Sequence, residues 1–142
     1  MTTVKFYDSV ADELLKFAVI VSRSGGKWVF CKHKDRDTFE CPGGHREAGE
    51  DILDTAKREL YEETGATDFD ITPVCVYSVI AEDSFNGEET FGLLCFAEIR
   101  SFEMELHSEI EKIILTDSPV EKWTYPNIQP KLLAKIIEKG FY

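Results

Sequence analysis

Hydrophobic and polar residues divide the chain into short strand-like runs and two stretches with helical spacing. Runs rich in β-branched and aromatic residues, bounded by polar or glycine-containing turns, are typical of strands. Such runs predict strands at residues 16–23, 28–33, 71–82, 90–100 and 109–116. The turn sequence SGGK between the first two runs predicts a β-hairpin.

The two helical stretches show apolar residues at spacings of three and four. In residues 50–64 these are Ile52, Leu53, Ala56 and Leu60. In residues 127–140 they are Leu132, Leu133, Ile136 and Ile137. Gly65 and Gly140 supply the stop signals. Because helices do not regularly separate the strands, we expect an α+β layered domain and not a doubly wound parallel sheet.

Size and charge narrow the class of protein and of ligand. The 142 residues, 43% of them hydrophobic, predict one globular domain spanning 1–142. Asp and Glu outnumber Lys and Arg by 27 to 16, which gives a net charge of −11. A field of this sign repels polyanions, so long nucleic acid is not a favoured partner. A phosphate-containing ligand would therefore depend on a bound cation.

The lack of recognisable targeting signals and the pattern of cysteines indicate a reducing location. No run of apolar residues is long enough for a membrane span, and the first residues do not resemble a signal peptide. The four cysteines stand singly, three of them within apolar runs, so we expect buried free thiols and no disulfide framework. These observations predict a cytoplasmic protein without membrane contact.

The segment RELYEETGA (58–66) places three glutamates at an unfavourable end of a helix. The C-terminal end of a helix already carries the negative end of the dipole, and carboxylates three and four residues apart repel one another. On a helical projection Glu63 falls within the apolar stripe, Glu59 borders it, and Glu62 lies farther round. Two interpretations are open for this cluster.

The first interpretation is a solvated acidic face, but no cation after Gly65 offsets the charges, and partial burial adds a further cost. The second is a site for a divalent cation. Hard cations such as Mg²⁺ prefer clustered carboxylate oxygens and convert the same repulsions into attractions. The metal interpretation therefore accounts for the dipole, the repulsion and the burial together.

Residues 44–66, GHREAGEDILDTAKRELYEETGA, also resemble a known family pattern. The segment is similar to the Nudix box, G-x5-E-x7-R-E-U-x-E-E-x-G-U with U an apolar residue, and fills every defined position. The flanks resemble Nudix proteins as well, with a hairpin and FECPGG before the box, and strands and a closing helix after it.

The resemblance implies a Nudix fold, an α/β/α sandwich around a mixed sheet, and hydrolysis of a nucleoside diphosphate derivative that depends on Mg²⁺ or Mn²⁺. It implies that Arg58 pairs with Glu50 and orients the catalytic helix. Arg58 points elsewhere on the helix than Glu59, so we expect it to leave the metal face free. The implied metal ligands are Glu59, Glu62, Glu63 and the carbonyl of Gly44. A homodimer is common among such proteins.

Residues outside the box supply weaker candidates. Glu109 and Glu111 could provide an extra acid or base, although solvated charge at a strand edge explains them equally well. Aromatic residues could stack on a base, or could belong to the core or its rim. The candidates for stacking are Phe39, Trp123 and Tyr125, with Trp28 and Phe91 in addition.

The substrate is predicted less sharply than the reaction. Residues 80–83, IAED, carry neither the proline of many ADP-ribose hydrolases nor the tyrosine of some dinucleoside polyphosphate hydrolases. The stretch 25–50 is similar to MutT-like enzymes, which favours cleavage of a (d)NTP, 8-oxo-dGTP among them, to a (d)NMP and pyrophosphate. The alternatives are hydrolysis of ADP-ribose or a nucleotide sugar, removal of pyrophosphate from RNA 5′ ends, and a nucleotide-binding module without catalysis.

Overall fold

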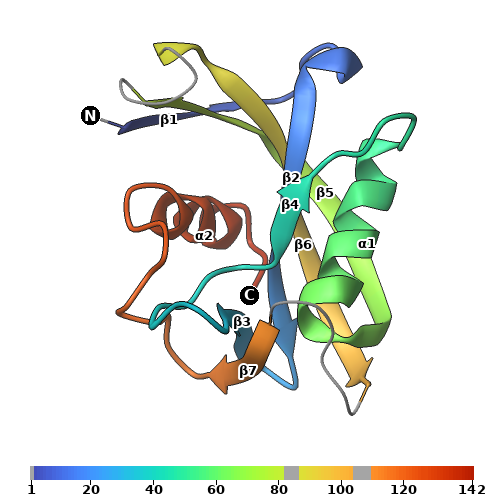
Figure 1. Cartoon of the computed structure of the whole chain (residues 1–142), viewed down its shortest axis with the longest axis vertical. Coiled ribbons are helices and arrows are strands. Elements are labelled where there is room, and N and C mark those ends of the chain that lie inside the picture. The colour runs from blue at the N-terminus through green and yellow to red at the C-terminus, as the bar shows by residue number, and fades with distance from the viewer. Residues whose placement is uncertain (1, 82–86, 104–109) are drawn as a thin grey trace.

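A mixed β-sheet lies between two helices in the computed structural model, which describes residues 2–81, 87–103 and 110–142 (Figure 1). The strands are β1 (Thr2–Tyr7), β2 (Leu15–Ser24), β3 (Lys27–His33), β4 (Gly43–His45), β5 (Ala66–Ala81), β6 (Thr90–Phe102) and β7 (Ile110–Thr116). The helices are α1 (Ile52–Thr64), α2 (Gln129–Glu138) and a short 3-10 helix, η1 (Asp12–Leu14).

The strand order is β1-β5-β6-β2-β3-β7, and β4 pairs with β2 outside this row. Strand β2 runs parallel to β6, whereas the other described strand pairs are antiparallel. The sheet is therefore mixed, and the predicted α+β class is confirmed.

Successive residues of β2 face opposite sides of the sheet, because side chains alternate along a strand. Ala18 and Ile20 belong to the core under α1, which adds Ile52, Ala56 and Leu60. Val19 and Val21 belong to the core under α2, which adds Leu132, Leu133 and Ile136. One amphipathic helix thus covers each face, as the α/β/α sandwich requires.

Helix α1 has a well-defined beginning and end. The side chain of Asp51 accepts a hydrogen bond from the Leu53 N–H at 2.9 Å, which is the arrangement of an N-cap. Gly65 adopts a left-handed conformation with φ of 77° and donates its N–H to Tyr61 O at 2.8 Å. The helix begins two residues later than the predicted start at Glu50, because Asp51 is extended and caps it.

Strand pairing decided several boundaries that the hydrophobic pattern did not. Strand β5 begins at Ala66 and not at residue 71, because pairing with β6 as far as Phe102 includes the mostly polar stretch TDFD. Strands β1 and β4 were not predicted. The predicted loop 35–44 was wrong at its end, since Gly43 and Gly44 pair with Val19 and Ala18.

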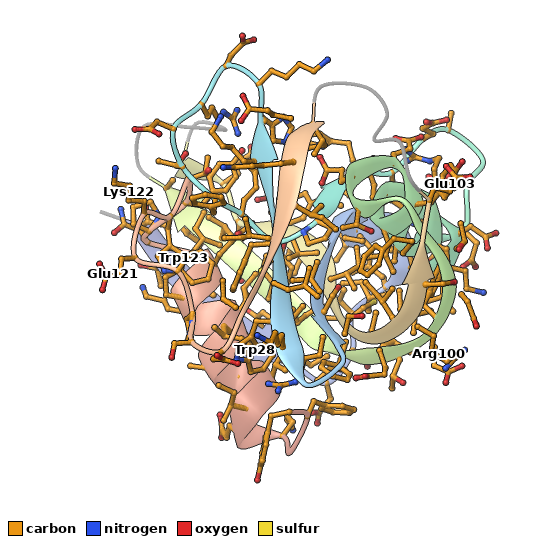
Figure 2. The ribbon with its side chains drawn as sticks, turned by 90° about the horizontal axis from the view of Figure 1, so that it is seen from below. Trp28, Arg100, Glu103, Glu121, Lys122 and Trp123 are labelled. Atoms are coloured by element: carbon orange, nitrogen blue, oxygen red, sulfur yellow. The ribbon has the colours of Figure 1, made fainter. Side chains whose placement is uncertain are left out.

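Burial agrees with the prediction for the cysteines. All four cysteines are buried and free. Trp28 lies under the guanidinium of Arg23, 4.3 Å from the ring centroid, and Figure 2 shows Trp28 well away from Arg100. Within the described ranges, no helix has both the length and the apolar character that a membrane span needs.

Candidate active site

Helix α1 places two glutamates against strand β4 and leaves a third more open to solvent. The side chains of Glu59 and Glu63 are 12% and 13% exposed, whereas that of Glu62 is 42% exposed. The greater exposure of Glu62 follows its predicted position around the helix, whereas Glu59, predicted at the border of the apolar stripe, is as buried as Glu63. Two carboxylates therefore lie in a setting where water cannot fully solvate them.

The two glycines of β4 allow these carboxylates to approach the backbone. The Gly43 N–H donates to Glu63 Oε1 at 2.7 Å. A Cβ on Gly44 would lie 1.5 Å from Glu59 Oε2, and one on Gly43 would lie 2.5 Å from the carbonyl oxygen of Ala18. The pair Gly43–Gly44 is thus required by a close contact and not by an unusual backbone angle.

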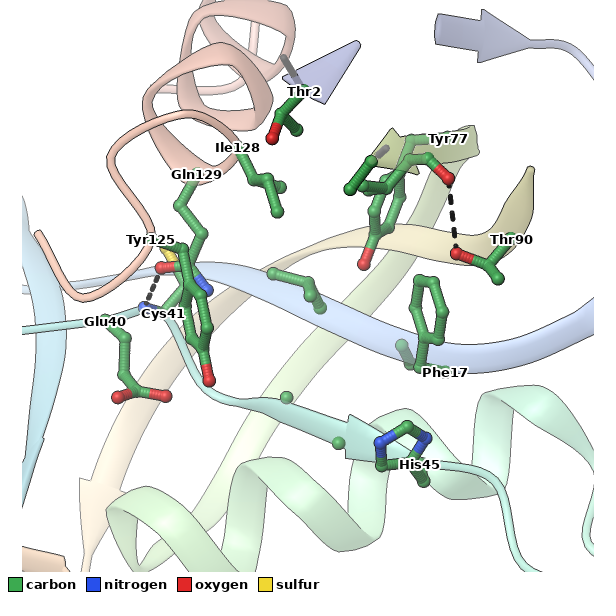
Figure 3. A pocket seen from close by; sticks show the side chains of 16 residues that line it. Thr2, Phe17, Glu40, Cys41, His45, Tyr77, Thr90, Tyr125, Ile128 and Gln129 are labelled. Atoms are coloured by element: carbon green, nitrogen blue, oxygen red, sulfur yellow. Dashed lines mark hydrogen bonds between the residues drawn. The ribbon is translucent and has the colours of Figure 1, made fainter. Parts of the chain in front are cut away.

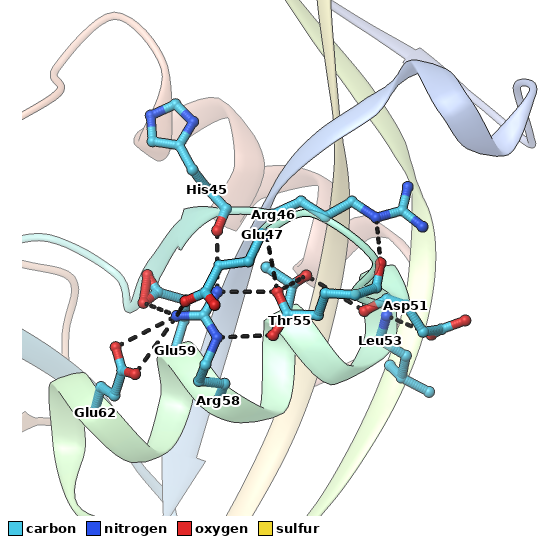
Figure 4. A network of polar contacts seen from close by, with 10 residues as sticks. His45, Arg46, Glu47, Asp51, Leu53, Thr55, Arg58, Glu59 and Glu62 are labelled. Carbon is cyan, nitrogen blue, oxygen red and sulfur yellow. Dashed lines mark hydrogen bonds and ion pairs between the residues drawn. The ribbon is translucent and has the colours of Figure 1, made fainter.

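Arg58 forms the ion pair that the box predicted. Its Nε and Nη2 atoms donate to the two carboxylate oxygens of Glu50 at 2.8 and 3.0 Å, and Nη2 also donates to the carbonyl of His45 at 3.0 Å (Figure 4). The hydroxyl of Thr55 donates to Glu50 as well, at 2.6 Å. Glu50 therefore fixes Arg58 between the loop and the helix.

The expectation that Arg58 leaves the metal face free was wrong. Its Nη1 atom lies 3.1 Å from Glu59 Oε1 and 3.4 Å from Glu62 Oε2. Arg58 can reach both acids because Glu59 is its neighbour and Glu62 is one turn farther along the helix. Arg58 thus joins the helix to the loop and also partly neutralises two of its carboxylates.

The pKa values of the acids report how far their charges are balanced. Hydrogen bonds from Arg58 and Thr55 lower the pKa of Glu50 to about 2. Burial raises the pKa of Glu63 to about 8, and the charges of Glu59, Glu40 and Glu62 add to the rise. Burial, together with Glu62, raises the pKa of Glu59 to about 7. Glu50 has a matched cation, whereas Glu59 and Glu63 lack enough positive charge.

The donor set fits a hard divalent cation. Carboxylate oxygens of Glu59, Glu62 and Glu63 and the backbone of Gly44 are the ligand types that Mg²⁺ and Mn²⁺ accept. In the described part of the chain no three His, Cys, Asp or Glu side chains converge as a formed metal cage. Glu59 and Glu62 contact Arg58 instead, and Glu63 contacts Gly43.

Two residues that the sequence did not single out lie beside Glu63. His33 Nε2 is 3.3 Å from Glu63 Oε2 and 3.5 Å from Glu40 Oε2. Glu40 is only 6% exposed, and its Oε1 accepts a hydrogen bond from Arg36 Nη1 at 2.9 Å. Strand β3 supplies His33 and the following loop supplies Glu40, so no spacing within the box could have identified them.

A cavity of about 440 Å³ opens on the other side of β4, beneath the start of α2 (Figure 3). Gly43 and Gly44 line it and also contact the carboxylates of α1. Its apolar and aromatic lining includes Phe17, Val19, Tyr77, Val79 and Ile128. An apolar cavity with a few polar groups is the usual form of a small-molecule site.

The polar end of the cavity has a fixed hydrogen-bonding direction. Gln129 is 5% exposed, and its Oε1 accepts the Cys41 N–H at 2.8 Å (Figure 3). With its carbonyl oxygen engaged, the amide of Gln129 has N–H groups left to donate. The opposite wall is compact, since a Cβ on Gly92 would lie 2.3 Å from the ring of Phe17.

The aromatic candidates separate into lining and packing residues. Tyr125 lines the cavity. Phe39 and Trp123 are absent from its described lining: they form a bridge with each other, and Trp123 packs edge-on against Phe30 at 5.3 Å. Trp28 and Phe91 also pack within the fold, Phe91 against Tyr7. The sequence missed Phe17 and Tyr77 because an aromatic residue in a strand gives no sign of which neighbour it will face.

Of the acids outside the box, Glu111 is described and Glu109 lies outside the described residues. Glu111 Oε2 is 3.2 Å from Lys32 Nζ, and its side chain is 47% exposed.

Comparison with known proteins agrees with the geometry. The family model of the NUDIX domain matches residues 13–129. The chain belongs to the Nudix family. A curated relative, YtkD of Bacillus subtilis (strain 168), is named as a candidate 8-oxo-dGTP diphosphatase and is 30% identical over 102 residues. The matched stretch covers 72% of this chain but only 61% of that relative.

Solved structures extend the similarity over the whole fold of this Nudix protein. The crystal structure of a mutant of the Bacillus subtilis pyrophosphohydrolase BsRppH has a TM-score of 0.79 and 25% identity, and the match covers 99% of this chain and 92% of that one. The NUDIX domain of Shewanella oneidensis NrtR, solved with ADP ribose, has a TM-score of 0.65 and 13% identity, with 88% and 87% covered. The second likeness shows the shared fold alone.

Proposed function

We propose that this Nudix protein hydrolyses a phosphoanhydride bond with the help of a divalent cation, converting a (d)NTP to a (d)NMP and pyrophosphate. One observation carries the proposal: Gly43 and Gly44 separate buried carboxylates on α1 from a nucleoside-sized cavity under α2. A nucleotide in the cavity would direct its phosphates across the two glycines toward the acids. The name of the relative YtkD supports 8-oxo-dGTP as one substrate to test.

Glu59, Glu62, Glu63 and the Gly44 carbonyl would hold the cation. When bound, Mg²⁺ or Mn²⁺ supplies positive charge to the phosphates and lowers the pKa of coordinated water. The remaining tasks belong to the protein. Arg58 and Glu50 fix the helix, and the Gly43 N–H holds Glu63. The apolar cavity excludes water from the nucleobase and thereby positions the phosphates of the nucleotide.

The general base has candidates from two sources. Glu111 and Glu109 were predicted from the sequence, and Glu111 is described as partly exposed and paired with Lys32. Glu40 is an additional candidate, because it is buried and lines the cavity. His33 contacts both Glu40 and Glu63, so Glu40 also lies close to the proposed cation site. Its position on the cavity side favours Glu40 for contact with the attacking water.

A nucleotide panel tests the proposal. Purified protein is incubated with Mg²⁺ and the four dNTPs, 8-oxo-dGTP, ADP-ribose, nucleotide sugars and a 5′-triphosphorylated RNA, and products are separated by ion-exchange chromatography. Pyrophosphate and a (d)NMP from a (d)NTP support the proposal. AMP and a sugar phosphate from ADP-ribose would favour the nucleotide-sugar alternative. No turnover of any compound, together with nucleotide binding, would indicate a binding module without catalysis. Glu63→Gln is the control for contaminating phosphatases.

A further inference from the structure

The loop that connects β4 to α1 is tied to the N-terminal segment by one arginine, Arg46. Its guanidinium donates to three backbone carbonyls: Asp12 O at 2.9 Å, Leu15 O at 3.2 Å and Glu50 O at 2.6 Å. Nη2 also donates to the carboxylate of Asp12 at 3.0 Å. The side chain is only 19% exposed, so these contacts are partly protected from water.

Backbone hydrogen bonds also hold this loop, from the Arg46 N–H to Lys16 O at 2.8 Å and from the Glu50 N–H to Glu47 O at 3.1 Å, but the Arg46 side chain joins it to both η1 and β2. Residues 46–51 form neither helix nor strand, and Gly49 has a φ of 76°. Three carbonyls from two segments must be satisfied together, which requires several donors in a fixed plane. A guanidinium provides them, whereas the single ammonium of lysine cannot reach all three in the same geometry.

The contacts of Arg46 continue to the acids of α1. Arg46 holds the backbone of Glu50, and the side chain of Glu50 holds Arg58. Arg58 in turn contacts Glu59 and Glu62. Figure 4 shows Arg46 and Arg58 joined by dashed lines to the same loop, with Glu59 and Glu62 next to Arg58.

We propose that Arg46 is a positioning residue for the metal site, anchoring Glu50 to η1 and β2 so that Arg58 keeps Glu59 and Glu62 in place. Arg46 occupies a position that the Nudix box leaves open, and its partner Asp12 lies outside the matched residues 13–129. This inference rests on the proposed function, because it takes the carboxylates of α1 as the cation site.

The test measures Mn²⁺ binding to the free protein, by electron paramagnetic resonance of unbound Mn²⁺, for the wild type and Arg46→Gln. We expect affinity to fall about tenfold, the lower end of the effect of removing an outer partner of a metal ligand. Arg46→Lys should recover part of the loss. At saturating Mg²⁺, kcat should fall while the KM for the nucleotide changes by less than about twofold, because the cavity does not contact Arg46.

Arg100→Gln is the matched control. Arg100 also binds two carboxylates, Asp68 and Asp70, but at the exposed surface of β5 and β6 (Figure 2). Its removal should leave Mn²⁺ affinity unchanged. Equal Mn²⁺ affinity in Arg46→Gln and the wild type would overturn the inference.

Two further variants keep the outcomes distinct. If circular dichroism shows that Arg46→Gln does not fold, Asp12→Ala replaces it and removes only the carboxylate partner. We expect Asp12→Ala to bind Mn²⁺ about threefold more weakly, and unchanged binding would overturn the inference.

Glu62→Gln reports on the proposed function itself. If it binds Mn²⁺ as the wild type does, the cation site is wrong. If only Glu62→Gln loses binding, the site stands and the role of Arg46 is wrong.

Discussion

The two sides of strand β4 are built by different physical means. On the side of α1, Glu50, Arg58, Glu59 and Glu63 are held by hydrogen bonds and ion pairs. On the side of α2, the cavity is formed by packed strands, with Phe17 and Tyr77 5.6 Å apart between ring centroids. Two glycines form the shared boundary.

The difference indicates how the work is divided. Charged groups at fixed distances suit the handling of phosphates and cations, which are alike in many nucleotides. An apolar cavity with one oriented amide suits the choice of the base. Variants on the α1 side should therefore change kcat, whereas variants on the α2 side should change KM.

Removing one carboxylate on the α1 side should have the largest effect. Glu62→Gln or Glu63→Gln should lower kcat about a hundredfold or more, because a neutral amide cannot replace a charged ligand of the cation. Circular dichroism should show an unchanged fold. Near-normal Mg²⁺-dependent turnover in both variants would remove the metal assignment.

The boundary itself can be altered at Gly44. In Gly44→Ala the new methyl group must displace the carboxylate of Glu59, since a Cβ would lie 1.5 Å from its Oε2. We expect kcat to fall about 10- to 100-fold. Stability should change little, because the displaced atoms are the end of a flexible side chain.

Gly25→Ala is the matched control for this glycine. Its Cβ would meet open space, but its φ is 58°, so the substitution should cost about 1 kcal/mol of stability. Its kcat should stay at the wild-type value. Full activity in Gly44→Ala would show that the close approach of Glu59 is not required.

On the α2 side, Gln129→Glu replaces the amide NH₂ group, a hydrogen-bond donor, with a carboxylate oxygen, a hydrogen-bond acceptor. The new carboxylate can still accept the Cys41 N–H, but it presents an acceptor to the cavity where the amide presented a donor. We expect the KM of the best nucleotide to rise about tenfold, the value of one hydrogen bond, with kcat within about threefold. Asn127→Asp, an exposed amide-to-acid change nearby, should alter neither constant. A change in kcat alone would contradict the proposed division.

The smallest expected effect concerns stability against pH in the metal-free protein. Glu63, with its pKa raised to about 8, binds a proton in the folded state that the unfolded chain, with a pKa of about 4.3, has already released. Its contribution is therefore present at low pH and lost as pH rises toward 8. Thermal unfolding in the presence of EDTA should show that Tm falls by about a few °C between pH 5 and pH 8, because the folded protein holds the Glu63 proton at a growing free-energy cost over this range.

Glu63→Gln should reduce this fall, and an identical slope in both proteins would contradict the assigned burial of Glu63. Glu50 acts in the opposite direction. Its pKa is lowered to about 2 by Arg58, so its contribution is lost as pH falls from about 4.3 toward 2.

Local patterns were sufficient for much of the fold. Apolar spacing located both helices, and alternating or apolar runs located strands β2, β3, β5, β6 and β7. Strand β4 escaped because three residues of glycine and histidine carry no hydrophobic signal. Strand β1, which pairs with β5 across 69 to 79 residues of sequence, was also missed. A strand becomes visible only through its partner when its own sequence is short or polar.

By itself, the sequence determined the family, the acids of the box and the greater exposure of Glu62 than of Glu59 and Glu63, because all of these depend on neighbours within 23 residues of one another. Tertiary structure alone decided that Arg58 also reaches Glu59 and Glu62, that Glu40 and His33 adjoin Glu63, and that Gln129 offers its amide to the cavity. Helical periodicity fixes angles within one element, whereas contacts between elements depend on how the sheet and both helices pack.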